Sequence, residues 1–338
     1  MIMPHASATT LPSAPAVPPR TAPKRTLARA GQCLLYLLVA LFILEVGLRL
    51  ILGLGDRPLM QADHAAGYVL KPNQHLFRFF AHTDVNSFSM RSPEVMVMKP
   101  AGTYRVLLVG DSMTYGGTQV DQKKIFASLL ATELPAQLHR PVEVLNASDS
   151  AYGIGNELGY LQSRGTFNAD LVLLVLNSGD MGQSTSTLAD VGGESSTTKS
   201  PCALCELWTR YVGPRLFHIK RKLDAGSQFG SDSPANVGPN LERLNEFQQA
   251  VAGNHARMGV VFLAARSWIH NSAEAAATPS LVQWAAQHQV PLLDVTGAEM
   301  PYSSKEITLD GIHFNAKGHR IAATAIEQHW AELTTPLP

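Results

Sequence analysis

The chain has 338 residues, of which 45% are hydrophobic and 16% charged, and its 27 basic residues balance its 27 acidic ones. This length is enough for one large domain or two small ones. A formal net charge of zero provides no positive field for nucleic acid, and the cysteines and histidines lack zinc-site spacing. We therefore predict neither a nucleic-acid partner nor a zinc site.

The amino-terminal stretch, residues 1–32, is predicted to be disordered and cytoplasmic. It is rich in Pro, Ala, Ser and Thr, so it cannot bury enough apolar surface to offset the entropy of ordering. Its charged residues are all basic: Arg20, Lys24, Arg25 and Arg29. Such an excess of positive charge beside an apolar segment favours the cytoplasmic side of a membrane.

Residues 33–54 are predicted to form one transmembrane helix. The run from Cys33 to Leu54 is dominated by Leu, Val, Ile, Phe and Ala, and its length matches the hydrocarbon core of a bilayer. A cleavable signal peptide has a shorter apolar core followed by a cleavage site of small residues. We therefore expect an uncleaved, single-pass anchor in the cytoplasmic membrane, with the rest of the chain in the periplasm or outside the cell. The all-basic flank argues against a buried helix of a soluble protein.

Two charged residues, Glu45 and Arg49, interrupt this apolar run. They are four residues apart, so they lie on one helix face and can pair. They form either a solvated pair at the membrane interface or a contact with a partner helix.

Residues 55–98 form a lead-in without clear periodicity, and residues 99–335 alternate short apolar runs with amphipathic stretches. The predicted strands are 104–109, 142–145, 171–176, 260–264 and 291–295, and the predicted helices are 125–134, 157–163, 241–256, 280–287 and 315–333. This alternation predicts a doubly wound parallel α/β sheet with helices on both faces. Functional residues are then expected at the carboxyl ends of the strands.

Residues 182–240 are predicted to be an insertion. Its first half is polar and glycine-rich, which indicates a mobile loop. Its second half is either a surface helix with a solvated basic face or a lid or patch that meets anionic lipid or polymer; it contains Trp208, Tyr211 and Phe217 among Arg210, Arg215, Lys220, Arg221 and Lys222. Cys202 and Cys205 could form a small disulfide loop if this segment is exported, or they could be ordinary thiols.

The first chemical motif is the segment GDSMTYG, residues 110–116, directly after the first predicted strand. A serine on a tight turn at a strand end can expose its hydroxyl, and the same turn can direct backbone N–H groups at an oxyanion. The alternative is that Ser112 merely caps a helix. Asp111 is expected to brace the turn.

The second motif is Asp310 with His313, just before the last predicted helix. A histidine held by a carboxylate supplies the base that a serine nucleophile needs. The alternative is a helix-capping aspartate with an incidental histidine. His319 is expected to pack or to face solvent rather than act as a second base.

Together these motifs resemble the SGNH/GDSL hydrolase family over residues 99–335. GDSMTYG resembles the family's first block, and DGIHFNAKGH, residues 310–319, resembles its last. The resemblance implies a three-layer α/β/α flavodoxin-like fold and ester hydrolysis or acyl transfer without metal or cofactor. It makes Ser112 the nucleophile and first oxyanion donor, His313 the base and Asp310 the group that orients it.

The family's middle blocks supply the other oxyanion donors. Counted from Asn146, Ala151 takes the family's glycine position, and Gly153 follows two residues later. Alanine keeps an N–H, which serves if the backbone does not require a positive φ. In the third block Asn177 can donate its side-chain amide, whereas alignment on Asp180 places Gly179 there.

We therefore predict a serine esterase that hydrolyses acetyl or other short acyl esters at the cell envelope. The resemblance also implies an O-acetyltransferase or deacetylase that modifies an exported, acetylated polysaccharide. A third alternative is a non-catalytic envelope protein that uses the same fold as a binding module. The expected partners are the acyl ester and the membrane.

Overall fold

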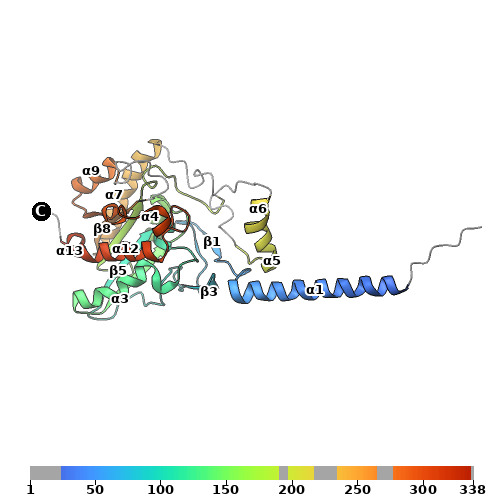
Figure 1. The fold of residues 1–338 in the computed structure, drawn as a ribbon. Coiled ribbons are helices and arrows are strands. Elements are labelled where there is room, and N and C mark those ends of the chain that lie inside the picture. Colours follow the sequence, from blue (N-terminus) through green and yellow to red (C-terminus); the bar gives the residue numbers. More distant parts are fainter. Residues whose placement is uncertain (1–23, 190–196, 217–233, 265–276, 336–338) are drawn as a thin grey trace, which may run out of the picture. The chain divides into compact units, whose positions relative to one another are not determined.

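The computed structural model describes residues 24–189, 197–216, 234–264 and 277–335. The chain divides into two compact units, Met1–Leu44 and Glu45–Pro338. The described part of the first unit belongs to helix α1 (Lys24–Leu52), whose last turns lie in the second unit. All other elements belong to the second unit (Figure 1).

Helix α1 begins earlier than the sequence analysis predicted. It starts at Lys24, so the prediction of disorder over residues 1–32 is wrong from that residue onward; residues 1–23 lie outside the described part of the chain. Pro23 is the last proline before the helix, and without a further proline the backbone hydrogen bonds extend through the basic flank. The part long and apolar enough to cross a membrane is Ala28–Leu52, with a mean hydropathy of 2.4.

The helix ends at Leu52, two residues before the predicted end, because the chain turns at Gly53. Gly53 has φ +64°, and a Cβ there would lie 1.7 Å from the carbonyl oxygen of Phe77. Glycine therefore lets strand β3 (Gln74–Arg78) pass directly against the end of α1.

The lead-in contains four short strands within the described residues. They form two antiparallel pairs, β1 (Met60–Asp63) with β2 (Gly67–Leu70) and β3 with β4 (Ala81–Val85). Strands of four or five residues are too short to show a period in the sequence, which is why residues 55–98 gave no predicted element.

The central sheet of the described chain has five parallel strands in the order β6-β5-β7-β8-β9. Their bounds are β5 Tyr104–Gly110, β6 Val142–Ser148, β7 Leu171–Asn177, β8 Arg257–Leu263 and β9 Leu292–Asp294. Strands β5 and β7 are buried along their whole length, as central strands covered on both faces must be. The strand order is that of a flavodoxin-like doubly wound fold.

Helices cover both faces of this sheet and make three layers (Figure 1). Side chains alternate between the faces along each strand. On one face the strands pack against α4 (Ile154–Arg164), α7 (Val237–Gly253) and α9 (Pro279–Gln287). On the other they pack against α3 (Phe126–Leu138), α12 (Ala316–Gln328) and α13 (Trp330–Thr334). The predicted last helix, 315–333, is thus two helices separated at His329.

The insertion holds short helical segments in its described residues. They are α5 (Ala203–Glu206), the π-helix η3 (Leu207–Val212), α6 (Gly213–Leu216) and the 3-10 turn η5 (Pro234–Asn236). Part of the predicted loop (190–196), together with Phe217, Lys220, Arg221 and Lys222, lies outside the described residues. Cys202 and Cys205 are joined by a disulfide.

Candidate active site

Ser112 is the first residue of the short helix α2 (Ser112–Tyr115), directly after strand β5. The Asp111 side chain caps this helix, because its Oδ1 accepts the Met113 N–H at 2.9 Å. Gly116 ends the helix in the left-handed region with φ +82°. This single turn fixes Ser112 at the carboxyl end of the central sheet, and Asp111 braces it as expected.

Asp310 and His313 lie in the turn between α11 (Ser304–Ile307) and α12. One carboxylate oxygen of Asp310 accepts the N–H groups of Ile312 and His313 at 3.0 and 2.9 Å. The other oxygen lies 2.6 Å from His313 Nδ1. The aspartate therefore shapes the turn and holds the imidazole at the same time.

The two motifs meet across 201 residues of chain: His313 Nε2 lies 2.9 Å from Ser112 Oγ. With a proton on Nδ1 shared with Asp310, Nε2 is the nitrogen that can accept the serine proton. The three residues predicted as a triad are thus brought together in the geometry in which a histidine links a hydroxyl to a carboxylate.

Asp310 is held in its charged form. Burial alone would raise its pKa, but the His313 side chain and the N–H groups of His313 and Ile312 lower the pKa to about 2. A carboxylate that stays ionised near neutral pH can stabilise positive charge on the imidazole.

Ala151 lies beside the pair, in a pocket that it lines with Ser112, Asn177, Ile312 and His313. Its φ is +63°, so alanine adopts the left-handed backbone for which glycine is suited. In the described part of the chain no acceptor takes the N–H of Ala151 or of Ser112. These two backbone donors are available to an oxyanion.

Two other predicted oxyanion donors have their hydrogens engaged elsewhere. Asn177 donates its amide to Asp111 Oδ2 at 2.8 Å and to Asp180 Oδ1 at 3.1 Å, so we correct its role to bracing the carboxylates behind the site. Gly153 donates its N–H to Asn156 Oδ1 at 3.1 Å as the cap of α4, so it is not a donor to the site either.

Gln183 is a pocket residue that the sequence analysis missed. Its Nε2 donates to the carbonyl oxygens of Ala151 and Tyr152, both at 3.1 Å, and its side chain is buried. It holds the strained turn that presents the Ala151 N–H. Because it lies in the insertion and belongs to no motif, no signal in the sequence marked it.

Arg91, from the lead-in, supports the loop that follows α2 and was also missed. Its buried guanidinium donates to the carbonyl oxygens of Tyr115 and Val120 at 2.7 and 2.6 Å and to that of Gly117 at 2.5 Å. A buried cation with several carbonyl acceptors fixes the backbone around it. The lead-in thus supports the loop next to the site from behind.

Glu157, on α4, is a buried carboxyl behind Asp111. Burial, and then the charge of Asp111, raise the pKa of Glu157 well above its ordinary value. Neither of its carboxyl oxygens has a hydrogen-bond partner among the residues that the structure describes. We therefore take Glu157 to be neutral, while Asp111 accepts hydrogen bonds from Met113 and Asn177.

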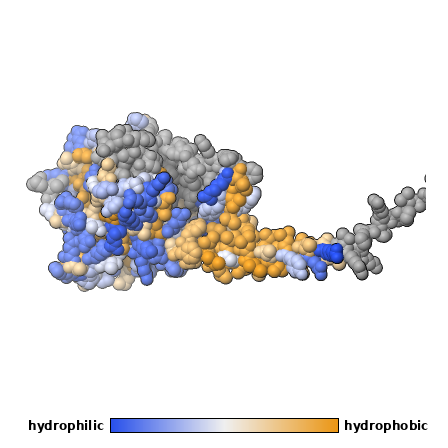
Figure 2. Space-filling view, viewed as in Figure 1, coloured by the Kyte–Doolittle hydropathy of each residue, from blue (hydrophilic) through white to orange (hydrophobic). Residues whose placement is uncertain are grey.

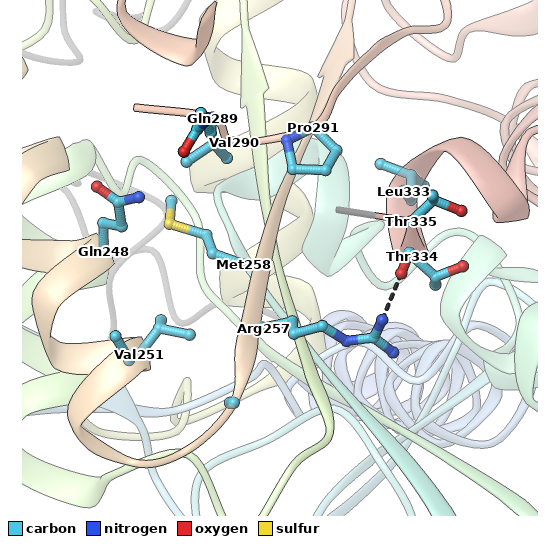
Figure 3. Close-up of a pocket in the computed structure, with 12 residues that line it drawn as sticks. Gln248, Val251, Arg257, Met258, Gln289, Val290, Pro291, Leu333, Thr334 and Thr335 are labelled. Atoms are coloured by element: carbon cyan, nitrogen blue, oxygen red, sulfur yellow. Dashed lines mark hydrogen bonds between the residues drawn. The ribbon is translucent and has the colours of Figure 1, made fainter. Parts of the chain in front are cut away.

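The pocket at Ser112 is small, about 20 Å³. A larger cavity of about 260 Å³ lies where strand β8 begins, beside Met258, Val290 and Pro291 (Figure 3). Because the strands are parallel, that cavity lies at their amino ends, whereas Ser112 lies at their carboxyl ends. Arg257 in this cavity donates to the carbonyl oxygen of Thr334. The residues that line the cavity include no serine or cysteine paired with a histidine.

Among the described residues no three His, Cys, Asp or Glu side chains are grouped as metal ligands would be.

His319 is buried, and its Nδ1 accepts the Phe126 N–H at 3.3 Å, so it packs between helices as expected. Ser112, Asp310 and His313 lie together as predicted. Of the four predicted oxyanion donors, Ser112, Ala151 and Asn177 line the pocket and Gly153 does not.

No curated protein matches the chain. Similar solved structures include a psychrotrophic esterase from Pseudoalteromonas sp. (14% identity, TM-score 0.41, covering 66% of this chain and 94% of that one). An acetyl-xylooligosaccharide esterase from Geobacillus stearothermophilus is 13% identical, with TM-score 0.42 over 71% of this chain and 97% of that one. A lipase/acylhydrolase from Enterococcus faecalis is 15% identical, with TM-score 0.41 over 70% of this chain and 99% of that one.

The sequence pattern of one family matches more than half of the chain, over residues 108–321. The match begins in the strand before Ser112 and ends beyond His313, so it includes both motifs. The protein is an ester-hydrolysing enzyme that belongs to the GDSL-like lipase/acylhydrolase family.

Proposed function

We propose that the protein is a serine esterase of the cell envelope, with Ser112 as nucleophile, His313 as general base and Asp310 as the group that orients the base. The observation that carries this proposal is the pair of contacts at His313. Its Nε2 lies 2.9 Å from Ser112 Oγ and its Nδ1 lies 2.6 Å from Asp310 Oδ2.

The first half of the reaction forms an acyl-serine. His313 Nε2 accepts the Ser112 proton as Oγ attacks the ester carbonyl carbon, and the Asp310 carboxylate stabilises the imidazolium. The carbonyl oxygen becomes an oxyanion, which the N–H groups of Ser112 and Ala151 stabilise. The imidazolium then gives its proton to the departing alcohol as the C–O bond breaks.

The second half repeats these steps with water. His313 removes a proton from the water as it attacks the acyl carbon, and the proton then passes to Ser112 Oγ as the acid leaves. About a third of the His313 side chain (29%) and half of the Asp310 side chain (52%) are exposed, so water can reach the base. Water is therefore the acceptor that we propose for the second half of the reaction.

We propose that the acyl group is short, because the pocket at Ser112 leaves little room for a long chain. A volume of about 20 Å³ is close to that of a single water-sized probe, and Ile312 and Gln183 line its wall. We propose an acetyl group as the acyl part and an acetylated envelope polysaccharide as the substrate class.

The esterase proposal predicts hydrolysis of p-nitrophenyl acetate by the purified protein, faster than hydrolysis of the octanoate. Ser112→Ala and His313→Ala should each remove nearly all of this activity, because either change breaks the nucleophile–base pair. Ser150→Ala is the matched serine control and should keep it. Full turnover by Ser112→Ala would contradict the mechanism.

We further propose that α1 anchors the enzyme in the cytoplasmic membrane, with the amino end inside and the chain after residue 56 outside. The basic residues before the apolar span support this orientation. The Cys202–Cys205 disulfide supports it independently, because disulfides persist in oxidising compartments.

This topology predicts that protease added to intact spheroplasts digests the chain beyond α1 and leaves a protected fragment that contains α1. A tag at residue 1 should resist the same treatment until the membrane is permeabilised. Protection of the second unit with digestion of the tag would reverse the orientation.

A further inference from the structure

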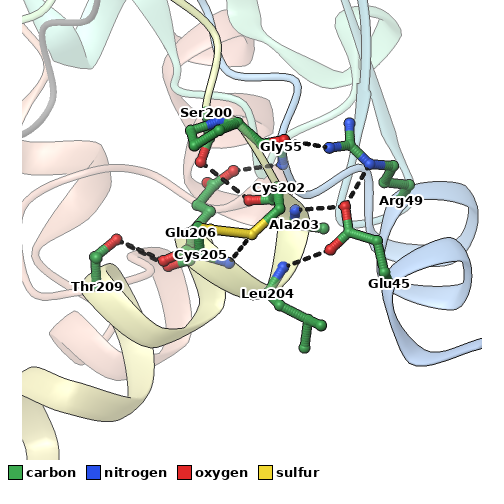
Figure 4. The surroundings of a disulfide bond; sticks show 11 residues. Glu45, Arg49, Gly55, Ser200, Cys202, Ala203, Leu204, Cys205, Glu206 and Thr209 are labelled. Atoms are coloured by element: carbon green, nitrogen blue, oxygen red, sulfur yellow. Dashed lines mark hydrogen bonds and ion pairs between the residues drawn. A yellow bond between two sulfur atoms is a disulfide. The ribbon is translucent and has the colours of Figure 1, made fainter. Parts of the chain in front are cut away.

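The last turns of α1 are fixed to the body of the second unit by the helix α5 (Figure 4). The Glu45 carboxylate accepts the N–H groups of Ala203 and Leu204, both at 2.8 Å. Arg49 pairs with Glu45 at 2.6 Å and donates to the carbonyl oxygen of Pro201 at 3.2 Å. The charged pair in the apolar run therefore contacts a helix of the same chain.

A second set of contacts brings the β3–β4 hairpin to the same place. The Phe79 N–H donates to the Leu52 carbonyl oxygen at 3.1 Å. Arg78 and Glu206 form a buried ion pair at 2.6 Å, and Glu206 also accepts the Gly55 N–H at 2.6 Å. The end of α1, the hairpin tip and α5 are thus joined by buried polar contacts.

Large apolar side chains remain exposed around this junction. We call them the apolar collar: Leu50, Ile51, Phe80, Trp208 and Leu216, with exposed fractions of 73%, 56%, 69%, 52% and 61%. They come from the end of α1, the hairpin tip and the helices after α5. Figure 2 shows hydrophobic surface of the second unit gathered at the last turns of α1 and on the surface beside them.

The collar is built into the junction. Phe79, next to Phe80 at the hairpin tip, packs edge-on against Tyr211 with ring centroids 6.0 Å apart, and Tyr211 shares the helix η3 with Trp208. Phe80 has φ +64°, a backbone conformation that costs energy for a non-glycine residue. The fold therefore holds an aromatic ring outward at a strained position.

The chemistry of the collar fits a lipid surface. Exposed Arg215 lies on α6 beside Leu216, and aromatic side chains with nearby arginines are characteristic of the bilayer interface. The apolar span ends at Leu52, the residue to which Phe79 is hydrogen-bonded. A protein that ended its membrane contact at α1 would leave these side chains in water.

We propose that the apolar collar inserts into the outer headgroup region of the membrane that α1 crosses, so that the esterase domain rests on the lipid surface. This inference rests on the proposed anchoring by α1 but not on the proposed esterase mechanism. It identifies the partner of this face as phospholipid.

The test is spin labelling of the full chain in phosphatidylethanolamine–phosphatidylglycerol vesicles. Cys33→Ser removes the free thiol, and labelling without reductant spares the disulfide. Phe80→Cys and Trp208→Cys then probe the collar separately, so that one misfolded variant does not end the test. Val282→Cys on α9, exposed to 48%, is the matched apolar control, and Leu38→Cys probes the span.

For each label we compare the collision rate with oxygen to the collision rate with a water-soluble nickel chelate. The ratio of the two rates should be severalfold higher for labels at positions 80 and 208 than for the label at position 282. The label at position 38 should show an equal or higher ratio. Folding of every variant is checked by its p-nitrophenyl acetate activity relative to the Cys33→Ser parent or, if the parent is inactive, by its circular dichroism.

The other outcomes separate the possible failures. Water-like values at 80 and 208 with a membrane value at 38 would overturn the collar and leave the anchor standing. Water-like values at 38 as well would overturn both. The label at position 80 could instead be shielded from both reagents, with its spectrum broadened by a neighbouring label. That result would identify a second copy of the chain as the occupant and also overturn the proposal.

Discussion

At the scale of single residues, the site depends on side chains whose donor hydrogens are already used in hydrogen bonds within the protein. Asn177 looks like a free amide in the sequence, yet Asp111 and Asp180 take its donors. Asp310 holds His313 through the side chain and through the backbone of the same turn. The meeting of Ser112, His313 and Asp310 could be predicted because these residues lie in two compact motifs. The acceptor of each amide hydrogen could not, because it depends on neighbours distant in sequence.

Ala151 gives the residue-scale prediction. A left-handed φ costs an alanine roughly 1–2 kcal/mol, partly offset by the greater freedom of glycine in the unfolded chain. Ala151→Gly should therefore raise the free energy of unfolding by about 0.5–1 kcal/mol and keep esterase activity, because the N–H remains. Urea unfolding and p-nitrophenyl acetate turnover measure the two effects.

Ala147→Gly, in the buried strand β6, is the matched control and should lose stability, because its backbone is extended. A loss of stability in Ala151→Gly equal to that in Ala147→Gly would contradict the strain at Ala151.

At the scale of elements, apolar runs predicted the central strands well and the shorter pieces poorly. β5 and β7 are hydrophobic throughout and appeared where expected. The lead-in strands β1 to β4 were missed because each has only four or five residues. The break at His329 was missed too, because the apolar pattern of the last two helices runs on across it.

The contact between helices α12 and α3 makes stability depend on pH through His319. Burial, with the charges of Arg91 and His313, lowers the pKa of His319 from its ordinary 6.5 to about 3. Between these pH values only the unfolded chain takes up the proton. Stability that is fully present above pH 6.5 is therefore lost as the pH falls toward 3.

His319→Gln keeps a hydrogen-bond acceptor for Phe126 without a titrating group. From about pH 7 to about pH 5 the wild type should lose roughly 2 kcal/mol of unfolding free energy that the variant does not lose. Urea unfolding of both proteins at the two pH values measures this difference, with the exposed His139→Gln as a control for the substitution. Parallel losses in the wild type and His319→Gln would rule out His319 as the cause.

At the scale of the whole molecule, the fold joins the two ends of the esterase domain and fixes the domain to the end of its apolar helix. The strand order and the meeting of Ser112 with His313 follow from the α/β alternation and the placement of motifs at strand ends. The contact between Arg78 and Glu206 could not be predicted, because a buried ion pair between distant segments leaves no periodic signal. The same holds for Arg91 and Gln183.

Labelling with a biotinylated fluorophosphonate tests the central claim most directly, because this reagent reacts with a serine only where a neighbouring base activates it. We predict one phosphonylated peptide in the purified full chain, with the adduct on Ser112, and no adduct after heat denaturation or in His313→Ala. A folded protein that stays unlabelled, or that carries the adduct on another serine, would contradict the account.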